Sequence, residues 1–257
     1  MTHDAKSLSR ERFARHASEY VTSESHAGGE DLVRLVELAD PDPGWIALDV
    51  ATGGGHTAIA LAPLVARVVA LDLTPEMLEV ASGYAAERGV TGIEFVEGDA
   101  ERLPFDDATF DLVTCRIAAH HFPDVDRFVA EVLRVLKPGG RFVLQDQCVP
   151  TSTGAGTYVN VFERLRDPSH VCALSLEGWT VTLQRVGFAV DTVEQFEKRQ
   201  VLERWAARQS CDAATVSELR ALLEDSQGTI REWMAPEGDG DETTFAIRHV
   251  VLRAHKV

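Results

Sequence analysis

Three acidic residues stand at or just past the ends of apolar segments, and one of them precedes a run of glycines. Asp49 lies in the stretch Leu-Asp-Val-Ala-Thr-Gly-Gly-Gly-His, where the apolar segment Trp45–Val50 leads into three consecutive glycines. Asp72 and Asp99 follow two later apolar runs. Glycines have no Cβ, so a ligand can approach their backbone, and a helix that follows them offers free N–H groups. This pattern predicts a site for a nucleotide-like ligand.

Two ligand classes fit these residues. Gly53, Gly55 and Ala58 match the dinucleotide pattern G-x-G-x-x-G/A, and Asp72 lies about 20 residues further on, as a ribose-binding acid should. Asp49, however, precedes the glycines, where its carboxylate would repel a pyrophosphate. S-adenosylmethionine (SAM) has no phosphate and carries an ammonium and a sulfonium, so an acid at this position favours SAM. A nicotinamide-dependent oxidoreductase remains the alternative.

The elements that must position these residues alternate between strand and helix patterns. Apolar runs predict strands over Trp45–Val50, Arg67–Leu71, Ile93–Glu97, Phe110–Cys115, Arg141–Gln145, Gly187–Phe196 and Phe245–Leu252. Helix patterns lie in three of the four gaps between the first five, over Thr57–Val65, Thr74–Arg88 and Asp124–Leu136. Such alternation predicts an α/β fold with a parallel, doubly wound sheet, in which ligands bind at the carboxyl ends of the strands.

Composition narrows the function classes. The chain has 257 residues, 45% of them hydrophobic, and a net charge of −16 from 25 basic and 41 acidic residues, without a basic run. That balance argues against a nucleic-acid substrate. We find no apolar run long enough to span a membrane and no secretory leader, so we expect a cytoplasmic protein. The four cysteines form no C-x-x-C pair, so neither disulfides nor a metal site are expected.

Five motifs in this order and spacing resemble the class I SAM-dependent methyltransferases. They are LDVATGGGHTAIAL (48–61), LDLTPEML (71–78), EGDAERLPF (97–105), FDLVTCRIAAHHFPD (110–124) and VLRVLKPGGRFVLQD (132–146). The strings CRIAAHHF (115–122) and RLRDPSH (164–170) resemble a bacterial small-molecule branch near the ubiquinone/menaquinone-type methyltransferases. The resemblance implies a Rossmann-like sheet of seven strands, mostly parallel with an antiparallel last strand, with helices on both faces and helical cap segments.

The resemblance also implies contacts to SAM from residues at the strand ends. Asp49 and the loop Ala51 to Gly55 would meet the methionine end, Asp72 the ribose, and Leu73 and Met77 the adenine. Asp99 and Ala100 would also meet the adenine. The end of the fourth strand, including Cys115 and Arg116, would lie beside the sulfonium, and Tyr20 would belong to a lid. Thr52, Gly53 and Gly55 are the loop residues expected to contact the cofactor.

Histidines are the candidate catalytic bases. Transfer of a methyl group to oxygen, nitrogen or carbon removes a proton from the acceptor, whereas a thiolate or arsenite acceptor needs no base, and histidine titrates near neutral pH. His120 follows the fourth strand beside the expected transfer site, and His170 lies in the expected cap. His121 is expected to pack and to order the turn.

We therefore expect one domain, 1–257, with a core of 40–148, 185–199 and 243–255. Cap or lid segments over 1–30, 150–183 and 200–235 would shape a pocket for a small-molecule acceptor. The predicted function is SAM-dependent methyl transfer by in-line displacement, assisted by His120 or His170. A SAM-binding protein without methyl transfer is a second alternative, and a homodimer is compatible with the sequence.

Overall fold

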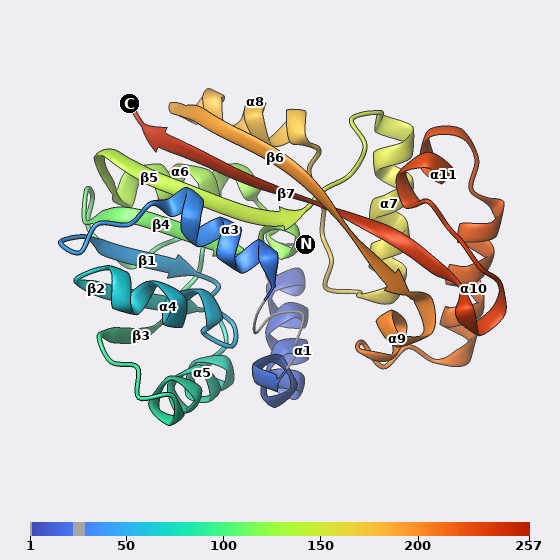
Figure 1. Cartoon of the computed structure of the whole chain (residues 1–257), viewed down its shortest axis with the longest axis horizontal. Helices are drawn as coiled ribbons and strands as arrows, with labels where there is room; N and C mark the ends of the chain where they lie inside the picture. The colour runs from blue at the N-terminus through green and yellow to red at the C-terminus, as the bar shows by residue number, and fades with distance from the viewer. Residues whose placement is uncertain (1, 23–28) are drawn as a thin grey trace.

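The computed structural model describes residues 2–22 and 29–257, and within the first helix it describes the side chains of 5–15 and 17. The strands form one seven-stranded sheet in the order β3-β2-β1-β4-β5-β7-β6 (Figure 1). Only β7 runs antiparallel to its neighbours β5 and β6, which confirms the predicted Rossmann-like sheet with an antiparallel last strand. The strands are β1 (Ile46–Val50), β2 (Arg67–Asp72), β3 (Ile93–Glu97), β4 (Phe110–Arg116), β5 (Leu136–Gln147), β6 (Phe188–Val201) and β7 (Thr244–Lys256).

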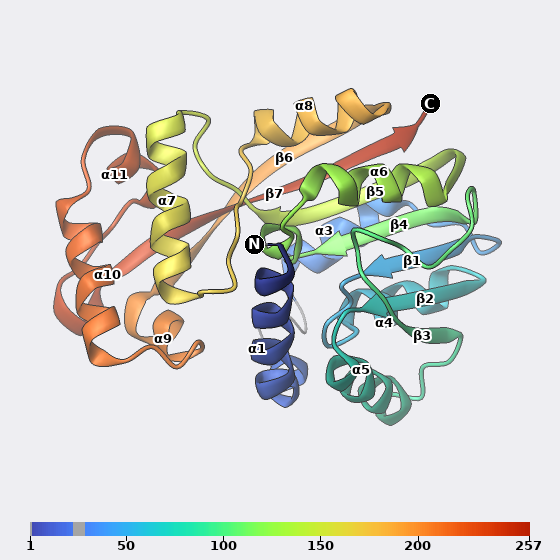
Figure 2. The same ribbon diagram turned by 180° about the vertical axis from the view of Figure 1, so that it is seen from behind.

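Both faces of the central strands are buried, which explains their nearly continuous apolar sequences. In β1, Ala47 packs in the cluster on one face, whereas Leu48 and Val50 pack in the cluster on the other. Helices α3 (Glu30–Ala39) and α4 (His56–Leu61) cover the first face. Helices α6 (Val125–Val135) and α8 (Leu176–Val186) cover the second, as Figure 2 shows. Helix α5 (Pro75–Glu87) packs against β2 and β3.

The long strands β6 and β7 carry a separate helical layer. They stay paired from Phe188 opposite Lys256 to Val201 opposite Thr244, whereas β5 accompanies β7 only over residues 249–255. Their far ends reach a cluster of helices at one side of the sheet (Figure 1), which we call the cap. It contains α7 (Thr153–Arg166), α9 (Leu202–Ala207), α10 (Ala213–Asp225) and α11 (Gly228–Met234).

The segment expected to form a cap over 150–183 divides in the structure. Helix α7 lies in the cap, where Phe162 stacks on Trp205 with ring centroids 5.3 Å apart. Helix α8 instead packs its buried Trp179 and Leu183 in the core cluster beside α6. The cap segment therefore ends before α8, because the apolar side of this helix covers the sheet. No helix in the described part of the chain is long and apolar enough to cross a membrane.

The first helix, α1 (Thr2–Thr22), lies between the parallel strands and the cap (Figures 1 and 2). Lys6 forms ion pairs with Asp99 at 2.7 Å and with Glu101 at 2.5 Å, in the loop after β3. Arg12 reaches the other side, 3.3 Å from the carboxylate of Asp167 in the cap. Helix α1 therefore connects the sheet to the cap across the strand ends.

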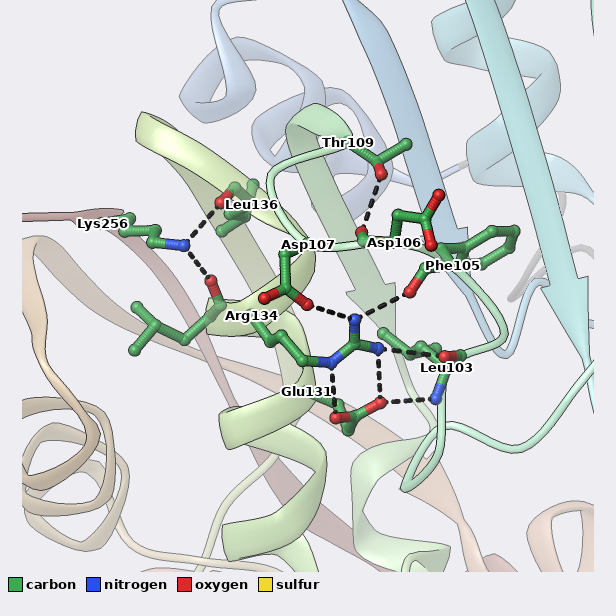
Figure 3. A network of polar contacts seen from close by, with 10 residues as sticks. Leu103, Phe105, Asp106, Asp107, Thr109, Glu131, Arg134, Leu136 and Lys256 are labelled. Carbon is green, nitrogen blue, oxygen red and sulfur yellow. Dashed lines mark hydrogen bonds and ion pairs between the residues drawn. The ribbon is translucent and has the colours of Figure 1, made fainter.

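An arginine on α6 holds the loop between β3 and β4 (Figure 3). The Arg134 guanidinium donates to the carbonyl oxygens of Leu103 at 3.0 Å and Phe105 at 2.7 Å, and both oxygens of Glu131 accept from it at 2.8 Å. Glu131 in turn accepts from the Leu103 N–H at 2.8 Å. This network fixes the loop whose first residues include Asp99.

The glycine turn after β1 depends on a backbone conformation that other residues rarely adopt. Gly55 has φ of +80°, and a Cβ at this position would lie 3.0 Å from the Cβ of Ala81 in α5. Glycine alone combines this dihedral angle with so close an approach at little cost. The turn can therefore pack directly against α5.

We expect Gly55→Ala to lower the free energy of unfolding by roughly 1–3 kcal/mol, through strain and crowding against Ala81. The matched control is Gly83→Ala, on the exposed side of α5, where an added Cβ meets no atom within 4 Å. That change should raise stability by about 0.5–1 kcal/mol, since alanine favours helix interiors. Urea unfolding of both variants measures the difference, and equal effects would contradict this account of the turn.

Candidate active site

One cavity lies at the carboxyl ends of β1, β2 and β4 and continues to the cap. We call its two parts the strand-end half and the cap half. The strand-end half is lined by Asp49, Ala51–Gly54, Leu71–Thr74, Met77, Gly98–Glu101 and Ile117. The cap half is lined by Gln147, Glu163, Arg166, Asp167, His170, Lys198, Gln200, Trp205, Arg208, Gln209, Ile247 and His249. His120 lines the cavity as well.

Asp49 is a buried carboxylate held by two hydroxyl groups. Its oxygens accept hydrogen bonds from Thr52 Oγ1 at 2.6 Å and from Thr114 Oγ1 at 2.8 Å. Thr114 is its register partner on β4, so the parallel pairing itself places that hydroxyl. Burial raises the pKa of Asp49 to about 6, although both hydrogen bonds oppose the shift. A positive charge nearby would stabilise the ionised form of Asp49 and lower its pKa.

Asp72 ends β2 and supports the glycine turn. Its two oxygens accept from the backbone N–H groups of Gly53 and Thr74, each at 2.9 Å. Burial raises its pKa, against the effect of these hydrogen bonds. The side chain of Thr74 and the backbone of Leu73 also stabilise the charged carboxylate. The same side chain therefore joins the first two strand ends and borders the cavity.

Two residues with side chains adopt the left-handed backbone conformation at the strand ends. Ala51 after β1 and Ile117 after β4 both have φ of +53°. This conformation is an outlier for a β-branched residue such as isoleucine, and such strain clusters at functional sites. The backbone hydrogen bond from the Ile117 N–H to the Gln145 carbonyl, at 2.7 Å, helps to hold it. Both residues line the cavity, so the strained turns shape its wall.

Arg116 lies at the end of β4 near a buried acid that the sequence analysis did not single out. Asp31, in the first turn of α3, is 3.6 Å from Arg116 and 2.8 Å from Lys198 of β6. Burial lowers the pKa of Arg116, while the charges of Asp31 and Asp49 act in the opposite direction. Asp31 thus links two cationic side chains of the cavity wall.

His120 forms a pair with an acid at the end of β5. Its Nδ1 lies 2.6 Å from one oxygen of Asp146, and its backbone N–H donates to the other at 2.9 Å. Since a carboxylate only accepts, Nδ1 carries a proton, and in the neutral ring Nε2 holds the lone pair. Burial disfavours the charged ring, but Asp146 outweighs it, so the pKa of His120 is raised. Among the described residues, none donates to Nε2.

The two other histidines considered in the sequence, His170 and His121, form hydrogen bonds with neighbouring residues. His170 Nε2 lies 2.7 Å from Asn160 Oδ1, and its Nδ1 lies 3.0 Å from Gln147 Nε2. Both ring nitrogens of His170 are therefore engaged in hydrogen bonds, and burial lowers its pKa to about 2. His170 has no free lone pair that could take a proton from a methyl acceptor. This geometry disfavours the predicted catalytic role of His170. His121 Nδ1 lies 3.0 Å from the Ser169 carbonyl oxygen, and this residue also lines the cavity.

The cavity includes most but not all of the residues expected to contact the cofactor. Asp49, Ala51, Thr52, Gly53, Asp72, Leu73, Met77, Asp99, Ala100 and Arg116 line it. Gly55 and Cys115 do not, because Gly55 faces α5 and Cys115 is fully buried in the core, which raises its thiol pKa. The side chain of Tyr20 lies outside the described residues.

Several cavity residues had no predicted role. Glu163 on α7 is 5% exposed, faces both this cavity and a small neighbouring one, and has a pKa raised to about 7 by burial. The structure shows that Glu163 is buried on α7 beside Phe162. Lys198 and His249 come from strands that the sequence did not connect to the site.

Comparisons with known proteins agree with this arrangement. Residues 48–144 match the family model described as "Methyltransferase domain". The uncharacterized methyltransferase YcgJ of Bacillus subtilis (strain 168) is 35% identical over 246 residues, which cover 95% of this chain and 97% of YcgJ. The crystal structure of YcgJ from the same species superposes with a TM-score of 0.85 at 34% identity, covering 88% of this chain and 98% of that one.

A second relative is similar over a shorter part of the chain. The ubiquinone/menaquinone biosynthesis C-methyltransferase UbiE of Brucella anthropi is 34% identical over 164 residues, which cover 62% of this chain and 60% of UbiE. The match to YcgJ spans nearly both chains, and the fold and the strand-end cavity are those the family motifs predict. The chain belongs to the class I SAM-dependent methyltransferases.

Proposed function

We propose that this enzyme transfers the methyl group of SAM to a small-molecule acceptor and that His120 removes the acceptor's proton. The observation that carries the proposal is a single cavity that joins the strand-end acids to the His120–Asp146 pair. In this assignment SAM occupies the strand-end half, and the acceptor enters the cap half.

The residues of the strand-end half suit SAM in their chemistry. Asp49 is buried and accepts hydrogen bonds from two neutral hydroxyls, and burial still raises its pKa, so a cationic ligand group nearby would stabilise its charged form. The carboxylate of Asp72 borders the same space as Asp99 and Ala100, where it can meet ribose hydroxyls. This set favours SAM over a dinucleotide, since the half of the cavity beside the glycines holds acids where a pyrophosphate would lie.

The protein's part in the reaction is positioning and proton removal. SAM, when bound, supplies a methyl group on a sulfonium, which needs little further activation. Asp146 fixes the His120 ring so that Nε2 can accept a proton. His170 and Gln147 pack beside it, with the His120 and His170 ring centroids 5.4 Å apart, and so orient the base. Helix α1 and the cap limit the entry of water.

The direct test of the function is transfer of labelled methyl groups from SAM to the small molecules of a bacterial metabolite extract. We expect label in at least one small molecule and none in protein or RNA. Binding of S-adenosylhomocysteine (SAH) without any transfer would instead support the non-catalytic alternative. Stabilisation by NADH and not by SAH would support the oxidoreductase.

Asp72→Ala should weaken the binding of SAH by about 1.5–3 kcal/mol, since ribose hydroxyls would lose a charged acceptor. Titration calorimetry measures the change, with Asp72→Asn as a variant that keeps the size of the side chain. The control is Glu76→Ala, an exposed acid in the first turn of α5 that does not line the cavity. Unchanged affinity in a folded Asp72 variant would exclude this residue from the cofactor site.

Asp146→Asn should lower the pKa of His120, because the carboxylate raises it. A base must be unprotonated, so methyl transfer in the wild type should rise with pH through the raised pKa. In the variant this rise should move to lower pH while the maximal rate falls. Nitrogen-15 NMR of the histidines measures the pKa without an acceptor. His120→Ala should lose turnover and keep SAH affinity.

The chain supplies a matched control in a second histidine–aspartate pair. His255 Nδ1 lies 2.9 Å from Asp191 at the far end of β6 and β7, outside the cavity. Asp191→Asn should leave both the rate and its pH dependence unchanged. If His120→Ala retains full turnover on the labelled acceptor, His120 is a packing residue and the proposed base is wrong.

A further inference from the structure

Two acids at the end of α7 line the cap half of the cavity, and they differ in their hydrogen bonds. Asp167 accepts from the Ser169 N–H at 2.9 Å and from Ser169 Oγ at 2.6 Å, and it lies 3.3 Å from Arg12. Burial acts to raise the pKa of Asp167, but the charge of His121 and the hydrogen bonds of Ser169 outweigh it. Glu163, one turn earlier, differs: among the described residues, none donates a hydrogen bond to its carboxyl group.

Glu163 is buried, and its surroundings disfavour its charge. Burial raises its pKa to about 7, although the positive charges of Arg166 and His120 act in the opposite direction. Its side chain lines both the main cavity and the small one beside it, which Met234 and Phe245 also line. The carboxyl group therefore exists in both protonation states near neutral pH, inside the wall of the cavity.

The side of α7 that carries Glu163 lies toward His120. Asn160, three positions before Glu163 and so on the same side of the helix, has its Oδ1 at 2.7 Å from His170 Nε2. The ring of His170 lies 5.4 Å from that of His120, between centroids. Glu163 and His120 line the same cavity, and the charge of each acts on the pKa of the other. A molecule bound in the cap half therefore meets both groups.

The fold does not need a carboxyl group at this position. Val159 and Phe162, its neighbours on the buried side of α7, pack in the apolar cluster of the cap. A buried polar group without a partner costs free energy, whereas an apolar side chain of the same size would not. Acids with raised pKa values in cavities are typical of functional sites. Glu163 thus favours a ligand that supplies the missing hydrogen bond.

The ligand group that fits Glu163 is a hydrogen-bond donor. A carboxylate only accepts, and Nε2 of His120 also accepts when its ring is neutral. A donor stabilises the ionised carboxyl group and lowers its pKa. The net charge of −16 favours a neutral or cationic ligand, while Arg166 opposes a cation close to Glu163. Hydroxyl and amino groups both meet these conditions.

We propose that Glu163 binds the methyl acceptor by accepting a hydrogen bond from one of its hydroxyl or amino groups. The proposal rests on the proposed function, because it places the cofactor in the strand-end half and the acceptor in the cap half. His120 acts on the reacting atom, whereas Glu163 selects molecules that carry a donor. Trp205 and Ile247 offer apolar surface for the rest of the acceptor.

The test is calorimetric titration of the SAH-saturated protein with two pairs of probes. Benzyl alcohol is compared with benzyl methyl ether, and benzylamine with benzyltrimethylammonium. Methylation removes the hydrogen-bond donor in each pair and keeps the ring and the charge. We expect the donor of at least one pair to bind at least tenfold more tightly than its methylated counterpart. The pair that shows the preference distinguishes a hydroxyl from an amino group.

Glu163→Met should abolish this preference and leave SAH affinity unchanged, because it removes the acceptor and fills the same space. Glu163→Gln keeps an accepting oxygen without the charge, so it should preserve a preference for the alcohol and weaken one for the amine. The Tm of both variants should equal or exceed that of the wild type. The control is Glu218→Gln, the same change at an exposed position of α10 that does not line the cavity. It should bind every probe as the wild type does.

Three results would overturn the proposal. The first is the lack of a tenfold difference within either pair, and absence of binding by all four probes at millimolar concentrations counts with it. The second is a preference that survives Glu163→Met. The third is a lower Tm with loss of SAH binding in both variants, because Glu163 would then maintain the fold. Failure of the wild type to bind SAH is a different result, since it contradicts the proposed function and not the role of Glu163.

Discussion

The parallel pairing of β1 with β2 and β4 is the constraint on which the site depends. Its register sets Asp49 opposite Thr114 and ends the three strands together, so the loops after them face one space. The hydroxyl of Thr114 then holds a carboxylate that burial alone would disfavour. Gly55 lets the turn pack against α5, and Asp72 fixes the turn through the Gly53 N–H.

The cavity divides by charge along its length. Buried acids and small backbone turns lie at the strand ends together with Arg116, whereas basic, acidic and polar side chains lie together beneath the cap. His120 lies at the junction, with its proton position determined by Asp146. The two halves come from different parts of the chain, and α1 joins them through Lys6 on one side and Arg12 on the other.

Much of the core could be predicted because its signals are local. Apolar runs, the glycine turn and Asp49, Asp72 and Asp99 all belong to short segments whose order implies a parallel sheet. Other features depend on tertiary contacts. The side chain of Cys115 packs in the core, Gly55 faces a helix, and His170 is engaged by Gln147 and Asn160 from β5 and α7. Helix α8 has an apolar side that the sequence alone does not assign to sheet or cap.

The sequence by itself determined the family, the sheet and the acids of the strand-end half, because strand periodicity and motif order are properties of neighbouring residues. Only the tertiary structure decided which histidine has a lone pair, that Asp31 lies against Arg116 and Lys198, and that Glu163 and Arg166 line one cavity without pairing. These relations join residues from distant parts of the chain. Their hydrogen bonds and pKa values follow from burial and packing, which no local pattern records.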